Sequence, residues 1–87
     1  MYEGWHIEFT DHARRRMLER LVKEGDVREA IRHPDSSQAD ARHGGRLLRR
    51  YLADWDRILV VAIEEQPAEG VVLVKTALWS PAKPNRC

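Results

Sequence analysis

The 87-residue chain has a single cysteine, no long apolar run and almost no excess of either charge. Because Cys87 is that single cysteine, no internal disulfide and no cysteine-rich metal site can form, and the cytosol is the expected compartment. The longest apolar runs, residues 58–63 and 71–74, are far shorter than the ~18 residues of a membrane span. The N-terminal residues also lack the basic start and apolar core of a signal peptide. We therefore expect neither a membrane partner nor a secreted protein stabilised by disulfides.

Most of the basic residues of the chain are arginines. A formal net charge of +1 is weaker than the usual charge of a nucleic-acid-binding domain. Arginine, however, makes planar bidentate contacts with phosphate or carboxylate, where lysine acts as a point charge. The composition therefore permits an anionic partner without requiring one.

Apolar periodicity and helix-capping residues predict an α+β domain that spans residues 1–87, in the order strand, helix, helix, strand, strand, strand. The expected strands are residues 5–9, 46–52, 58–64 and 71–79, and the expected helices are residues 11–23 and 26–33. Thr10 is expected to cap the first helix, Gly25 to end it, and Pro34 to stop the second. Both helices should pack on one face of an antiparallel meander. Residues 35–45 are expected to form a mobile surface loop and residues 82–87 a flexible tail.

One chemical pattern lies on the expected first helix, where His12, Arg16 and Arg20 recur every four residues. This spacing places the three side chains in one stripe along the helix. An imidazole can transfer a proton near neutral pH, and guanidinium groups stabilise charge on phosphate oxygens, so the stripe suits a phosphodiester. Arginines on a helix more often only solvate it, and Glu19 with Lys23 is an ordinary ion pair at i,i+4. A solvated helix face is therefore the alternative interpretation.

Further basic residues lie on the expected strands and in the loop before them. Arg49 and Arg50 should point to opposite faces of their strand, and Lys75 interrupts an apolar strand on the face of Ala77. Residues 42–46, Arg-His-Gly-Gly-Arg, could wrap a phosphate through backbone N–H groups, although they lack the strand-loop-helix context of a phosphate-binding loop. The four histidines have no tight metal-ligand spacing, so neither a metal nor another cofactor is expected.

The run Phe-Thr-Asp-His-Ala-Arg-Arg-Arg-Met-Leu-Glu-Arg at residues 9–20, with Asp26, Val27 and Pro34 after it, resembles the domain-of-unknown-function family numbered 4258. Members of that family begin with a strand, continue with a helix bearing His-Ala-x-x-Arg-Met-x-x-Arg and a short second helix, and end in a meander. The family is similar to the RelE/BrnT-like and barnase-like group of small RNase toxins. The resemblance therefore implies a RelE/barnase-like fold and a site at His12, Arg16 and Arg20, assisted by Arg46, Arg49, Arg50 or Lys75.

Two positions depart from the family pattern. Leu21 stands where the family has a glycine that opens a turn, and Lys23 stands where it often has a serine that caps the second helix. Lysine has no side-chain acceptor for a helix N-terminus. The first helix is therefore expected to continue beyond Arg20, which would change the direction of that side chain.

Two functions follow as hypotheses. The first is a toxin-like, metal-independent endoribonuclease with RNA as substrate and a separate antitoxin protein as partner. Its catalytic residues would be His12, Arg16, Arg20 and Arg49, and its RNA-binding residues would be Arg46, Arg50 and Lys75. The alternative is a non-catalytic module that binds an acidic protein or RNA with the same face. The exposed edge strands of a short meander would also allow homodimerisation.

Overall fold

The computed structural model describes residues 2–81, so the predicted tail, residues 82–87, lies outside the described residues. The elements follow the chain as β1 (His6–Phe9), α1 (Asp11–Glu19), α2 (Glu24–Arg32), β2 (Ser36–Ala39), β3 (Arg46–Leu52), β4 (Arg57–Gln66) and β5 (Val71–Trp79). The class is α+β, as the sequence predicts. The order contains one strand, β2, that the prediction lacks.

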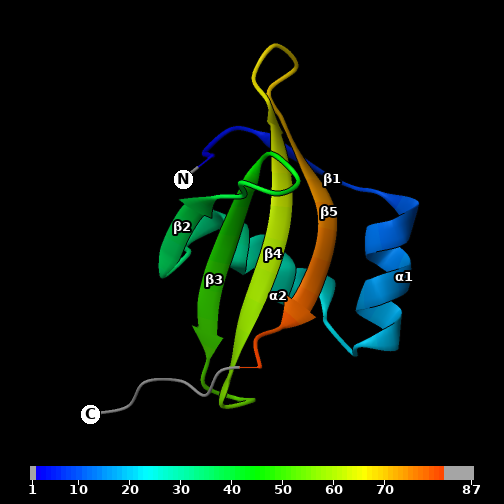
Figure 1. Ribbon diagram of the computed structural model, residues 1–87, viewed down its shortest axis with the longest axis vertical. Coiled ribbons are helices and arrows are strands. Elements are labelled where there is room, and N and C mark those ends of the chain that lie inside the picture. Colours follow the sequence, from blue (N-terminus) through cyan, green and yellow to red (C-terminus); the bar gives the residue numbers. More distant parts are fainter. Residues whose placement is uncertain (1, 82–87) are drawn as a thin grey trace.

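The five strands form one mixed sheet in the order β1-β5-β4-β3-β2 (Figure 1). Strands β3, β4 and β5 form the expected antiparallel meander, and β2 adds to it in antiparallel orientation. Strand β1 instead lies parallel to β5, with Phe9 opposite Val74. This parallel pairing joins the first strand of the chain to the last, a contact that local sequence patterns do not encode.

Strand β2 lies within residues 35–45, where the sequence predicts a mobile surface loop without a strand. Its sequence, Ser-Ser-Gln-Ala, has no apolar alternation, and its side chains are mostly exposed. The backbone of β2 nevertheless pairs along its whole length with β3, which satisfies its peptide groups without an apolar face. The irregular part of the segment is thereby reduced to the turn at Asp40–Gly45.

Helix α1 ends at Glu19, so the expected continuation beyond Arg20 is wrong. Leu21 has a φ of 55°, in the left-handed region, and the Val22 N–H donates to the Met17 carbonyl over 2.8 Å. A left-handed residue followed by such a bond is typical of a Schellman ending. The family pattern has glycine at this left-handed position. The chain has leucine there instead, and the turn still forms.

Helix α2 begins at Glu24, earlier than predicted, and Gly25 lies inside it rather than breaking α1. Lys23 at the N-cap makes no side-chain cap bond, as expected of lysine. Glu24 is an acidic residue in the first turn, where its negative charge interacts favourably with the positive end of the helix dipole. Hydrogen bonds from Arg28 and then Arg14 lower the pKa of the Glu24 carboxyl.

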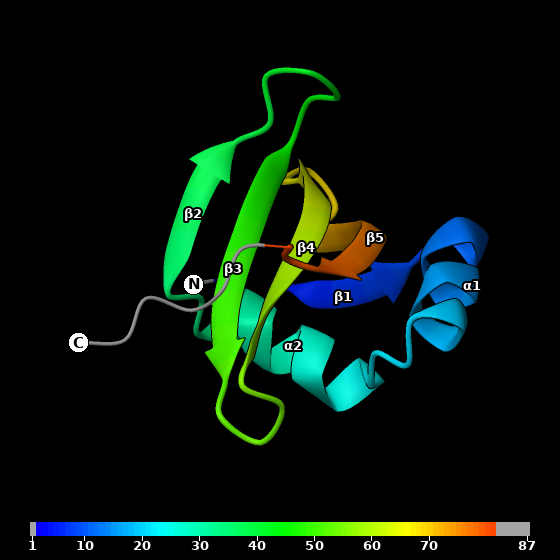
Figure 2. The ribbon, with the colours of Figure 1, turned by 60° about the horizontal axis from the view of Figure 1, so that its bottom comes forward.

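Helix α2 covers one face of the sheet, and α1 packs against β5 at its side (Figure 2). The prediction placed both helices over one face, whereas only α2 occupies that position. The core lies between α2 and the covered face, and it includes Val27, Ile31, Leu48, Leu59, Val61, Ile63, Val72 and Val74. In the described part of the chain no helix lies over the opposite, open face. Neither helix in residues 2–81 has the length and apolarity needed to span a membrane.

A β-bulge in β5 sets the direction of its side chains. Two adjacent residues of β4 lie opposite Val74 and Thr76, so Lys75 is one extra residue in the strand. Val74 remains in the core, and Lys75 joins Thr76 on the open face. The predicted shared face of Lys75 and Ala77 is therefore wrong, because Ala77 is fully buried in the core.

Candidate functional site

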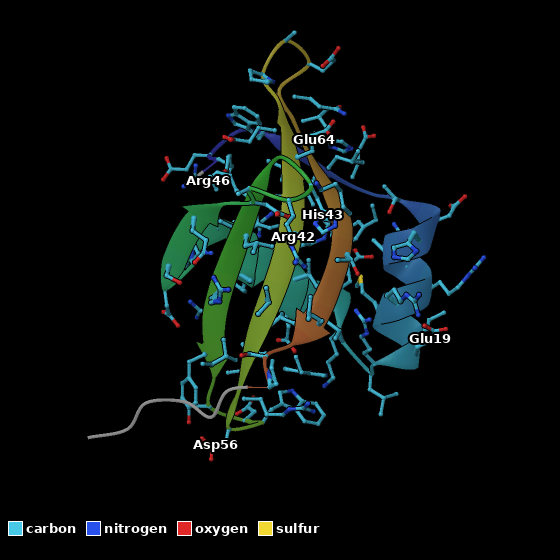
Figure 3. The ribbon with its side chains drawn as sticks, in the orientation of Figure 1. Glu19, Arg42, His43, Arg46, Asp56 and Glu64 are labelled. Carbon is cyan, nitrogen blue, oxygen red and sulfur yellow. The ribbon has the colours of Figure 1, made fainter. Side chains whose placement is uncertain are left out.

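A pocket of about 290 Å³ lies at the open face between α1, the turn after β2, and β5. It is lined by His12, Asp40, His43, Ala62, Lys75 and Thr76. His12 comes from the first turn of α1, and Lys75 and Thr76 come from the bulge. Figure 3 shows Arg42 and His43 extending from the turn over β4 and β5, on the side of α1. We refer to this site as the histidine pocket.

The turn at Asp40–Gly45 is fixed by its own hydrogen bonds. The Asp40 N–H donates to the Gly45 carbonyl, and the Gly44 N–H donates to the Asp40 carbonyl, both over 2.9 Å. One Asp40 carboxylate oxygen accepts from the backbone N–H groups of Arg42 at 3.1 Å and His43 at 3.2 Å. The other lies 3.5 Å from Nδ1 of His43. An imidazole whose Nδ1 faces a carboxylate presents Nε2 to a ligand.

Gly45 is the residue that lets the turn lie against the sheet. Its φ is +78°, and a Cβ at this position would overlap with the backbone carbonyl oxygen of Ile63. Gly44 has a similar φ of +74° but open space around it. Only glycine satisfies both the left-handed backbone and the close approach at Gly45. The turn is thereby held on β4 beside the bulge, which places His43 above β5.

Lys75 connects the bulge to the turn. Its Nζ donates to the Gly44 carbonyl at 2.9 Å and to the His43 carbonyl at 3.3 Å. An ammonium group has three donors, so one N–H remains for a ligand in the pocket. The positive charge of Lys75 is thus held at a defined position beside His43.

Asp40 supplies the negative charge of the histidine pocket. Burial raises the pKa of its carboxyl, but the backbone hydrogen bonds from His43 and Arg42 and the positive charges of His43 and Lys75 outweigh that effect. The pKa is therefore lowered overall, and Asp40 is ionised at neutral pH. The ionised carboxylate of Asp40 therefore faces the imidazole of His43, with 3.5 Å between Oδ2 and Nδ1.

Arg20, predicted as a site residue, is engaged with the backbone of β5. Its guanidinium donates to the Ala77 carbonyl at 2.9 Å, and the Arg20 carbonyl accepts from Trp79 Nε1 at 2.8 Å. Strand β1 ends at Phe9, so the second half of β5 has no neighbouring strand on that side. Arg20 satisfies a carbonyl on this free edge and fastens the end of α1 to the sheet.

Arg46 and Arg50 lie on the covered side of β3, since the register pairs Arg50 with Leu59 of the core. Arg50 donates to the His33 carbonyl over 2.6 Å, at the C-terminal end of α2. Arg46 donates to the Ser37 hydroxyl over 2.8 Å, and Figure 3 places it apart from Arg42 and His43. Neither residue lines the histidine pocket. Arg50 acts as a favourable cation at a helix C-terminus.

Arg16 and Arg49 are the predicted residues that remain toward solvent. Arg16 pairs with Glu19 over 2.9 Å on the surface of α1. Arg49 lies on the open face, donates to Gln38 over 2.8 Å and lines a second hollow beside the histidine pocket. Arg49 and Arg50 thus point to opposite faces, as the alternation of the strand predicts.

Of the predicted site residues, the structure brings His12 and Lys75 together in the histidine pocket. From the sequence, His43 is predicted only as part of a phosphate-wrapping run, and Asp40 and Thr76 are not predicted site residues. An aspartate at the start of a turn with two glycines is a signal that could have identified Asp40. No sequence signal identifies Thr76, because its position depends on the bulge. Among the described residues, no group of three or more His, Cys, Asp or Glu side chains could hold a metal ion.

Comparison with known proteins gives one family. The family model described as Domain of unknown function (DUF4258) matches residues 9–79. No curated protein and no solved structure matches the chain. The matched span extends from the end of β1 to the end of β5 and includes every residue that lines the histidine pocket.

Proposed function

The chain belongs to the DUF4258 family, and we propose that it is a metal-independent endoribonuclease whose active site is the histidine pocket. One observation carries the proposal. Two imidazoles from separate elements, His12 of α1 and His43 of the turn, converge on one pocket with the ammonium group of Lys75. This combination supplies an acid, a base and a cation without a metal ion.

Cleavage of RNA within its own backbone needs those three groups. A neutral imidazole takes the proton of a ribose 2′-hydroxyl, and the 2′-oxygen attacks the adjacent phosphorus. A cation stabilises the extra negative charge on the phosphoryl oxygens as the new P–O bond forms. The P–O5′ bond then breaks, and an imidazolium gives its proton to the leaving 5′-oxygen. The products are a 2′,3′-cyclic phosphate and a 5′-hydroxyl.

The residues of the pocket fit these roles. His12 and His43 share the acid and base roles, with Asp40 orienting the ring of His43. The remaining N–H of Lys75 and the hydroxyl of Thr76 are donors for the phosphoryl oxygens. Arg20 positions α1 through its bond to the Ala77 carbonyl, and the same guanidinium lies 3.5 Å from the Thr76 hydroxyl at the edge of the pocket.

The finer features of this proposal rest on the resemblance to RelE/BrnT-like RNases. They are a toxin-like role, a RelE-like fold and inhibition by a separate antitoxin protein. Action in the cytosol rests on the use of a single cysteine.

The alternative is a non-catalytic module that binds RNA or an acidic protein on the same face. The net charge of +1 favours it, because tight binding of a polyphosphate usually comes from many neutralised phosphates. Formation of a cleavage product separates the two functions.

The test is cleavage of a 5′-labelled single-stranded RNA by the purified protein in EDTA, with a ribosome-bound message as a second substrate. We expect fragments that end in a 2′,3′-cyclic phosphate, and no cleavage of the all-2′-deoxy oligonucleotide. His12→Ala and His43→Ala should each slow cleavage roughly 100-fold or more. His6→Ala is the matched control, since His6 is an exposed histidine on β1 outside the pocket.

The proposal fails if folded His12→Ala cleaves at the wild-type rate. It also fails if neither substrate is cleaved by the wild type. Circular dichroism of each variant shows whether a loss of activity reflects a loss of fold.

A further inference from the structure

A second hollow, of about 380 Å³, lies on the open face next to the histidine pocket. Its floor consists of apolar side chains from three neighbouring strands, Leu47, Val60, Ala62 and Leu78. Arg42 and Arg49 also line it. Four lining residues, Asp40, His43, Ala62 and Thr76, belong to both sites. We refer to this second site as the apolar hollow.

We propose that the apolar hollow is a nucleobase subsite, which takes the base of the nucleotide whose phosphate occupies the histidine pocket. This inference rests on the proposed ribonuclease function and names the part of the substrate that the neighbouring surface binds. The occupant is a base of single-stranded RNA, because only an unstacked base can offer its flat face to a sheet.

The floor is the first support for this assignment. Val60 and Ala62 lie on the open face, and in the described residues no helix covers them, yet they are only 7% and 6% exposed. Neighbouring side chains therefore cover most of Val60 and Ala62, and the half-buried Leu47 and Leu78 supply most of the apolar surface that a ligand in the hollow can contact. Contiguous apolar surface on an open sheet face is typical of a ligand site, and an aromatic base packs on such a floor through its π-face.

The rim is the second support. Arg49 donates to Gln38 over 2.8 Å at the surface, and its guanidinium lies on the open face at the rim of the hollow. Arg42 makes no side-chain hydrogen bond within residues 2–81 and extends from the turn over the sheet (Figure 3). Arginine stacks on bases and also binds phosphate, so a pair of arginines around an apolar floor suits a nucleotide chain.

Continuity between the two sites is the third support. His43 and Thr76 line both, so a ligand that has its phosphate beside His43 reaches the apolar floor without crossing a wall. The arrangement fits a nucleotide, whose base and phosphate are held apart by one sugar. An acidic protein segment would be attracted by the arginines but would leave the apolar floor without a matching group.

The probes are the four nucleoside 3′-monophosphates, which contain no bond that the proposed reaction cleaves, with inorganic phosphate as the reference. Binding is measured by NMR titration of the wild-type protein. We expect the nucleotides to bind at least roughly tenfold more tightly than inorganic phosphate. They should shift the methyl signals of Leu47, Val60 and Leu78, whereas inorganic phosphate should shift only signals of the histidine pocket.

Two variants sharpen the test. Leu78→Asn should reduce the advantage of the nucleotides over phosphate and leave the affinity for phosphate unchanged. Arg49→Gln should weaken the binding of the nucleotides more than the binding of phosphate. Leu18→Asn is the matched control, because Leu18 is 80% exposed on α1 and lies outside both sites. Its binding should equal that of the wild type.

The outcomes separate this inference from the proposed function. If nucleotides bind no more tightly than phosphate and the methyl signals do not move, the subsite is wrong, whether or not RNA is cleaved. If the nucleotides show the expected advantage but no RNA is cleaved, the subsite is supported and the ribonuclease proposal fails. If an acidic amphipathic peptide shifts these methyl signals and the nucleotides do not, the face binds protein and the inference is overturned.

Discussion

The two faces of the sheet use the same kinds of residue for different purposes. On the covered face, apolar side chains such as Leu59 are fully buried under α2, and Arg46 and Arg50 are bound by Ser37 and the end of α2. On the open face, Lys75 lines the histidine pocket and is bound to the turn, and Arg42 and Arg49 line the apolar hollow. Since the pleat alternates at every residue, the adjacent Arg49 and Arg50 lie on different faces: Arg50 contacts the end of α2, and Arg49 lines the apolar hollow.

Helix α1 shows a similar division along a single stripe. His12, in the first turn, reaches the histidine pocket, whereas Arg20, at the end of the helix, reaches the backbone of β5. Arg16, between them, pairs with Glu19 at the surface. A shared helix face therefore does not establish a shared role, because each turn of the helix meets a different part of the sheet.

The largest expected difference between the faces is in core stability. Leu59→Ala should reduce the free energy of unfolding by about 3 kcal/mol, because it leaves a cavity in a fully buried position. Leu78→Ala, on the open face, should cost only about 1 kcal/mol, since Leu78 is half-buried. Urea denaturation measures both. Equal costs would contradict the comparison and would indicate that the open face is covered in solution, which sedimentation could detect.

The next difference is between the two arginines of the stripe. Arg20→Ala should reduce the free energy of unfolding by about 1–2 kcal/mol, because the Ala77 carbonyl loses its donor in a partly buried position. Arg16→Ala should change it by less than about 0.5 kcal/mol, as expected for an exposed ion pair. Thermal unfolding of both variants measures the difference. If Arg20→Ala kept its full stability but lost RNA cleavage, Arg20 would have to be assigned to the chemistry.

The smallest expected effect is the pH dependence contributed by Asp40. Its pKa in the folded chain is lower than the ordinary value of 3.8, so its ionised form stabilises the fold. That contribution is fully present above the ordinary pKa and is lost as the pH falls through the lower pKa of the folded state. Asp40→Asn should therefore show a shallower loss of stability on acidification than the wild type, measured by urea unfolding from about pH 6 to pH 3. Asp54→Asn, at an exposed aspartate in the turn before β4, is the control for an Asp-to-Asn substitution outside the pocket.

Much of the fold could be predicted because its patterns are local. Strands β3 and β5 have the predicted bounds, and Thr10 caps α1 by accepting from the Ala13 N–H at 3.0 Å, as the sequence indicates. Strand β2 could not be predicted, because it is stabilised by backbone pairing with β3 and has no apolar face that a sequence pattern would reveal. The end of α1 was misjudged because Leu21 adopts a left-handed backbone that leucine rarely has, under the constraint of the Schellman bonds.

The candidate site was predictable only in part. His12 and Lys75 were accessible from helix spacing and from the break in an apolar strand. The convergence of His43 and Asp40 on the same pocket depends on a tight turn and on the contact of Gly45 with β4, which join residues distant in sequence. The backbone contacts of Arg20 and Arg50 could not be predicted, because a guanidinium that donates to a backbone carbonyl has the same sequence signature as one that binds phosphate.

The bulge in β5 has a consequence for how such a site can arise and disappear. Lys75 is the added residue, and Val74 and Thr76 on either side keep the faces that they would have in a regular strand. Loss or gain of one codon therefore removes or supplies the lysine while the buried residues of β5 keep their register with β4. A single insertion or deletion can therefore add or remove the cation of the histidine pocket, and the packing of the core stays the same.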